Sequence, residues 1–162
     1  MQHFNKKLSI METIEKSVEV LNDLIEINND RIAGFDHAGK DLEVNDADLK
    51  TIFDGLVDQS RKNVQELSAQ VGQIGGEVET GTSTSGAIHR AWLDVKATFS
   101  GHDRKSVLAE CERGEDAIKK AYKDALTPEN GLSHEVDRII ARQQEGIIAA
   151  HDKIKFLRDH QA

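Results

Sequence analysis

Apolar residues recur at helical spacing through the first half of the chain. Ser9 and Glu12 have the spacing of a capping box, and the apolar stripe that follows them predicts a long helix over about residues 10–38. A second stripe stops at a Gly-Gly pair and predicts a helix over about residues 47–74. The apolar positions of these stripes are Ile14, Val18, Leu21, Ile25, Ile32 and Phe35, then Leu49, Ile52, Phe53, Leu56, Leu67, Val71 and Ile74.

The second half carries two more long stripes and a shorter one. One predicts a helix over about residues 104–126, which should stop before Pro128 because the residue preceding a proline disfavours helical geometry. Another follows a suitable N-cap at Ser133 and predicts a helix over about 134–159. Between the two halves, a shorter stripe predicts an extra helix over about 87–99.

The unequal connections suggest a topology. The first two long helices are joined by a few residues, and so are the last two, which favours two antiparallel hairpins. The connection over about residues 75–103 is long enough to run back along a helix that rises about 1.5 Å per residue. We therefore expect one all-α domain over residues 1–162, a ferritin-like antiparallel four-helix bundle whose long crossover carries the short extra helix.

Composition agrees with this fold and narrows the partners. The chain has one proline, 4% aromatic and 31% charged residues, a mixture that suits exposed helical faces better than sheets. Its formal charge of −8 repels nucleic acid phosphates and anionic lipid surfaces, so we expect no nucleic acid and no membrane partner. The lone Cys111 can form no internal disulfide, and neither a signal peptide nor a membrane-length apolar run is visible. We expect a cytoplasmic protein.

Six polar residues interrupt the apolar stripes near the middle of the predicted helices. Because an unpartnered buried polar group costs about 1–3 kcal/mol, we expect these side chains to bond to one another or to trapped water. The simplest interpretation is a polar layer that sets the register of the helices. Its members are Asn28, Ser60, Asn63, Glu115, Gln143 and His151.

A metal site is the alternative interpretation of this layer. A di-iron centre in a bundle core takes a Glu from each of two helices and Glu-x-x-His from each of the other two, and that motif is absent from the sequence. Most charges of the run ECERGED, residues 110–116, fall on the expected solvated face. Glu115 and His151 are left as candidate ligands of a single ion, iron or another divalent metal.

Four strings carry a resemblance that spans about residues 17–159. They are LNDLIEINNDRIAGF, AIHRAWLDVKATFSG, LAECERGEDAIKKAYKDAL and HDKIKFLRD. The chain resembles a bacterial four-helix-bundle family of ferritin-like type that is known only as a domain of unknown function. The resemblance implies a ferritin-like fold, and it carries over no activity and no catalytic residues.

These observations support three hypotheses. The first is a non-enzymatic structural, stress-associated or interaction protein with no cofactor. The second is a metal-binding ferritin-like oxidoreductase with a degenerate site at Glu115 and His151. The third is a partner-binding module, in which Ile88, Trp92 and Phe99 of the crossover face another protein or a second copy of the chain in a homo-oligomer.

Overall fold

The computed structural model describes residues 2–40, 42, 46–78 and 104–161. Within these residues the chain forms four long helices and one short 3-10 turn, and no strand. The predicted all-α bundle is therefore confirmed, while the predicted extra helix over 87–99 lies outside the described residues. The elements are α1 (Gln2–Lys40), α2 (Ala47–Gln73), α4 (Arg104–Ala125), η2 (Pro128–Asn130) and α5 (His134–Asp159).

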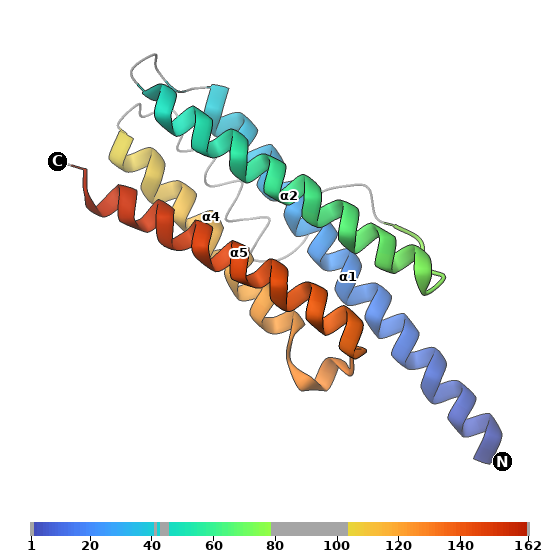
Figure 1. Cartoon of the computed structure of the whole chain (residues 1–162). Helices are drawn as coiled ribbons and strands as arrows, with labels where there is room; N and C mark the ends of the chain where they lie inside the picture. The colour runs from blue at the N-terminus through green and yellow to red at the C-terminus, as the bar shows by residue number, and fades with distance from the viewer. Residues whose placement is uncertain (1, 41, 43–45, 79–103, 162) are drawn as a thin grey trace.

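The helices form two antiparallel hairpins that pack side by side. α1 pairs with α2 and α4 with α5, and the hairpins meet through α1 against α4 and α2 against α5. Figure 1 shows that α2 and α4 run in the same direction, as the predicted up-down-down-up order requires. The guanidinium of Arg104, at the start of α4, lies 2.9 Å from Asp46 and 2.6 Å from Asp48, at the start of α2. This contact brings the two N-terminal ends together.

The helix ends follow local signals in most places. Ser133 Oγ accepts a hydrogen bond from the Val136 amide at 3.3 Å, which is the predicted N-cap. α2 ends where Gly75 adopts a φ of +83°, a left-handed conformation that favours glycine. A Cβ atom on Gly76 would lie 2.7 Å from Val18 Cγ2, so only a glycine lets this turn lie so close to α1.

The start of α1 differs from the prediction. The helix begins at Gln2, well before the expected start near residue 10. Ser9 does not cap a helix, because its carbonyl lies inside α1 and accepts a hydrogen bond from Thr13 Oγ1 at 2.9 Å. Figure 1 shows this part of α1 projecting beyond the other helices. Apolar side chains are exposed along it: Leu8, Ile10, Met11 and Ile14.

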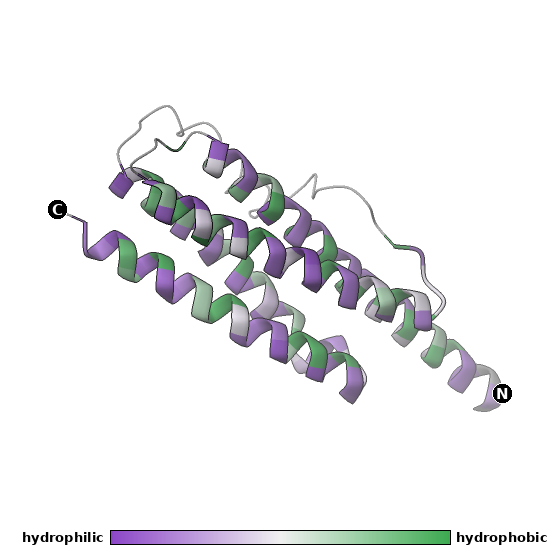
Figure 2. Cartoon of the chain, turned by 45° about the horizontal axis from the view of Figure 1, so that its top comes forward, coloured by the Kyte–Doolittle hydropathy of each residue, from purple (hydrophilic) through white to green (hydrophobic). Residues whose placement is uncertain are grey.

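The core consists of two apolar clusters, toward opposite ends of the bundle. Figure 2 shows hydrophobic and hydrophilic residues interspersed along every helix, as expected for helices with one buried face. One cluster contains Phe35, Leu49, Phe53, Leu108, Cys111 and Ile154. The other contains Leu21, Leu24, Ile25, Leu67, Ile118, Tyr122, Ile140 and Ile147. On α1, α2 and α4, buried polar residues occupy the positions between the clusters.

None of the described helices combines the length and the apolar character needed to cross a membrane.

Candidate functional site

A buried ion pair lies at the middle of the bundle. Arg31 of α1 and Glu115 of α4 are both fully buried. Arg31 Nε donates to Glu115 Oε1 and Nη2 donates to Oε2, each at 2.8 Å, so the pair is bidentate. Arg31 Nη1 donates to Gln59 Oε1 at 2.7 Å and to Ser60 Oγ at 2.9 Å, both on α2. The guanidinium thus joins three helices and satisfies both carboxylate oxygens of Glu115.

A second polar network includes one residue from each long helix. Asn28 Nδ2 of α1 donates to the Tyr122 hydroxyl of α4 at 2.9 Å, and this hydroxyl donates to Gln143 Oε1 of α5 at 2.7 Å. Asn63 Nδ2 of α2 donates to Asn28 Oδ1 at 3.2 Å. Burial raises the pKa of the Tyr122 hydroxyl above its usual range, which keeps it neutral and able to donate. The four members are uncharged and bond to one another, and Gln143 Nε2 also donates to Glu66 Oε1 at 3.4 Å.

The predicted polar layer is therefore divided into separate groups. Asn28, Asn63 and Gln143 belong to the neutral network, while Ser60 and Glu115 belong to the Arg31 cluster. Sequence reasoning missed Arg31 and Tyr122. Arg31 follows Asn28 by three positions and so shares its helical face, and a cation on that face is the partner that the inward Glu115 needs.

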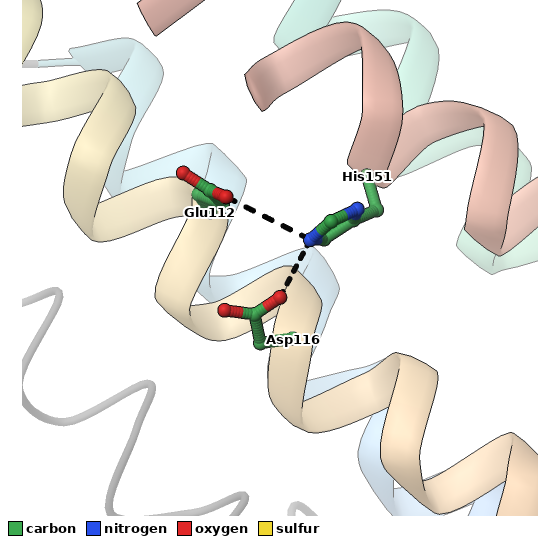
Figure 3. A group of neighbouring side chains, drawn as sticks. All are labelled: Glu112, Asp116 and His151. Atoms are coloured by element: carbon green, nitrogen blue, oxygen red, sulfur yellow. Dashed lines mark hydrogen bonds and ion pairs between the residues drawn. The ribbon is translucent and has the colours of Figure 1, made fainter. Parts of the chain in front are cut away.

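His151, the sixth predicted residue, lies in a separate cluster between α4 and α5. Its Nε2 atom is 2.5 Å from Asp116 Oδ1 and 3.8 Å from Glu112 Oε1 (Figure 3). Its Nδ1 atom is 3.0 Å from Asp152 Oδ1, next along α5. His151 and Glu112 are buried, whereas the side chain of Asp116 is 60% exposed. The cluster therefore opens to solvent on the side of Asp116.

Arg158 bonds to one member of this cluster from the same helix as His151. It follows His151 by two helical turns on α5, and its Nη1 atom bonds to Glu112 Oε2. The two oxygens of Glu112 thus have different environments, since Oε2 faces Arg158 and Oε1 faces His151. The hydrogen bond from His151 also lowers the pKa of the Asp152 carboxyl. We call Glu112, Asp116 and His151 the carboxylate–histidine cluster.

The structure does not bring Glu115 and His151 together as the predicted ligand pair. Both oxygens of Glu115 bond to Arg31, whereas His151 faces Glu112 and Asp116. The expectation that most charges of residues 110–116 fall on the solvated face was wrong, because Glu112 is buried as well as Glu115 and the Glu110 side chain is only 15% exposed. A signal for this cluster exists in the sequence, where Glu112 and Asp116 are four residues apart and share a helical face.

Cys111 is a buried free thiol near these groups on α4. Burial raises its pKa well above the usual range, and the charges of Glu115 and Glu110 raise it further. Because the thiolate is the reactive form, this cysteine is a poor nucleophile and a poor metal ligand.

Comparisons with known proteins place the chain in a family. A crystal structure of ferritin like, diiron-carboxylate proteins from Bacillus anthracis str. Ames is similar to it, with a TM-score of 0.65 and 14% sequence identity. The match covers 90% of this chain and 94% of that one, and at this identity it shows a ferritin-like fold and no more. No curated protein gives a significant match. A family model matches residues 16–128, and the chain therefore belongs to the family described as "Domain of unknown function (DUF2383)".

Proposed function

We propose that this chain is a non-enzymatic structural or interaction protein. It is a ferritin-like bundle in which the buried central carboxylate is paired with an arginine of the same chain and not with a metal ion. The observation that carries this proposal is the buried Arg31–Glu115 pair. Arginine supplies the positive charge that a core carboxylate requires, and it uses both oxygens that a metal ion would need. Displacing it would leave a buried guanidinium unpaired, which costs about 3–5 kcal/mol in comparable cases.

The similar Bacillus anthracis structure is described as a diiron-carboxylate protein, and a dimetal centre in this bundle would require matching ligands. Such a centre needs carboxylates and histidines from all four helices of the bundle. Among the residues that the structure describes, buried acidic side chains come only from α1 and α4: Asp30, Glu112 and Glu115. Of these, Glu115 bonds to Arg31 through both carboxylate oxygens. The donor set does not fit a dimetal centre in the core.

The experiment is an iron oxidation assay on the full chain under aerobic conditions. Fe²⁺ is added to the wild type, to Glu115→Gln and to a matched surface variant, Asp124→Asn, whose carboxylate pairs with Lys120 on the exposed face of α4. We expect all three proteins to leave the rate of iron oxidation at its value in buffer. Oxidation that the wild type accelerates and Glu115→Gln abolishes would refute the proposal.

The interaction part of the proposal has separate support. The exposed apolar side chains at the start of α1 include Leu8 and Met11, on a helix that projects from the bundle. Light scattering should show that the wild type self-associates or binds partners more strongly than a Leu8→Ser, Met11→Ser variant. We also propose a cytoplasmic location and no nucleic acid partner, supported by the buried unpaired thiol and the charge of −8.

The alternative function is a metal-binding protein in which His151 remains a candidate ligand and Glu115 does not. The observation that favours it is the carboxylate–histidine cluster, where three potential ligand atoms lie within 4.8 Å of one another. This cluster is distinct from the core pair, so it can bind an ion without disturbing Arg31.

A further inference from the structure

His151 is held in the manner of a metal-ligating histidine. Its Nδ1 atom lies 3.0 Å from Asp152 Oδ1, and an ionised carboxylate accepts hydrogen bonds, so this oxygen can accept the N–H of the tautomer protonated on Nδ1. Metal-ligating histidines almost always donate this second ring N–H to a carboxylate, a carbonyl or water, which fixes the ring and raises the basicity of the other nitrogen. That other nitrogen, Nε2, points at Asp116 and Glu112, as Figure 3 shows.

The two carboxylates come from a single rigid element. Glu112 and Asp116 are one helical turn apart on α4, and His151 faces them from α5. Arg158 bonds to Glu112 Oε2 and leaves Oε1 directed at His151, so it acts as a positioning residue for this ligand. Three carboxylates, those of Glu112, Asp116 and Asp152, lie around the imidazole, with Arg158 bonded to Glu112 and Lys119 and Lys155 near Asp152. Two of these carboxylates, Glu112 and Asp116, face the same ring nitrogen, which suits a bound cation.

The donor types select the class of cation. One imidazole nitrogen and two carboxylate oxygens suit Zn²⁺ and neighbouring transition metals, whereas Ca²⁺ and Mg²⁺ prefer oxygen ligands alone. Zn²⁺ bonds lie at about 2.0–2.2 Å for both donor types, so modest side-chain rotations would bring the three atoms, now within 4.8 Å of one another, around one ion. The exposed side of Asp116 gives the ion a path from solvent and leaves room for water as a further ligand.

We propose that Glu112, Asp116 and His151 bind one divalent transition-metal ion, best matched by Zn²⁺, which ties α4 to α5. The ion lies between His151 Nε2 and the facing carboxylate oxygens of Asp116 and Glu112. The site lies between α4 and α5, whereas the buried Arg31–Glu115 pair joins α1 to α4. Zn²⁺ has no redox chemistry, so this site is compatible with a non-enzymatic bundle and does not depend on that proposal.

The test is equilibrium dialysis of the full chain against Zn²⁺, with the bound metal counted per chain. The site variants are His151→Gln and Asp116→Asn. The matched controls are His134→Gln, an exposed histidine of α5, and Asp124→Asn, an exposed carboxylate of α4. We expect the wild type and both controls to bind one Zn²⁺ per chain, and both site variants to lose that saturable binding.

Two further measurements make the result decisive. Asp152→Asn should weaken binding by about 10–100-fold without abolishing it, because it removes only the group that orients His151. Circular dichroism shows whether each variant folds, and Asp116→Asn tests the site even if the buried His151→Gln does not fold, since Asp116 is exposed. Wild-type protein without saturable Zn²⁺ binding, or Asp116→Asn that binds like Asp124→Asn, would overturn the proposal.

Discussion

Replacing Arg31 by methionine would leave the carboxylate of Glu115 buried at the middle of the bundle with no cation opposite it. Removal of one partner from a buried ion pair costs about 3–5 kcal/mol. This is a large fraction of the roughly 5–15 kcal/mol by which a domain is stable. Ser60 and Gln59 would also lose the donor that they share. We therefore expect Arg31→Met to be among the most destabilising substitutions in the chain.

Urea unfolding, followed by the helical circular dichroism signal, measures this loss. With a urea dependence of about 2 kcal/mol per M, a loss of about 4 kcal/mol moves the midpoint down by roughly 2 M. Replacing both members, Arg31→Met with Glu115→Met, removes the charges together and should restore most of the stability, because such apolar pairs are often neutral or better. The double variant should be more stable than Arg31→Met alone.

The control for this experiment is the exposed pair of Lys120 and Asp124 on α4. Lys120→Met should change the stability by about 0.5 kcal/mol or less, since exposed helical ion pairs contribute little. The reasoning is refuted if Arg31→Met shifts the midpoint no more than Lys120→Met does. It is also refuted if the double variant is as unstable as Arg31→Met, because the loss would then come from packing instead of from an unpaired charge.

Three other substitutions test separate parts of the structure. Tyr122→Phe removes the hydroxyl that links two amides of the neutral network, and the amide oxygen left without a donor should lower the free energy of unfolding by about 1–3 kcal/mol in urea titrations. Gly76→Ala places a Cβ atom against Val18 and should lower the thermal midpoint by overpacking, at a cost of about 1–3 kcal/mol. Arg104 lowers the pKa of Asp48 from 3.8 to about 2, so this pairing stabilises the fold above about pH 4 and is lost as the pH falls toward 2. Acid titrations should therefore show a smaller loss of stability over this range in Arg104→Ala than in the wild type.

Much of the fold follows from local patterns in the sequence. The apolar period predicted the four long helices and their order, and the unequal connections predicted that α2 and α4 run in the same direction. The start of α1 was predicted wrongly because the capping signal at Ser9 competes with a run from Gln2 that contains neither proline nor glycine. A cap residue stops a helix only where the preceding residues do not continue it.

The partners within the site were harder to predict, because they depend on how each helix is rotated against its neighbours. The period placed Asn28, Glu115 and Gln143 on buried faces, and the structure buries all three. Glu112 and Glu115 are three residues apart and so lie about 60° apart on the helix, which lets one face α1 and the other α5. A rotation of α4 about its axis by a few tens of degrees decides which of the two glutamates faces His151. The apolar pattern of a single helix does not determine that rotation.

The ion pair between Arg31 and Glu115 also has a consequence for how the chain folds, because it joins residues separated by 84 positions. Each hairpin can close through contacts that are local in the chain, whereas this pair forms only when the two halves dock and expel water from both charges. We expect its formation to come after the rate-limiting barrier, so that Arg31→Met mainly speeds unfolding and changes the folding rate little. The pair would then prolong the lifetime of the native state by slowing unfolding, without speeding folding.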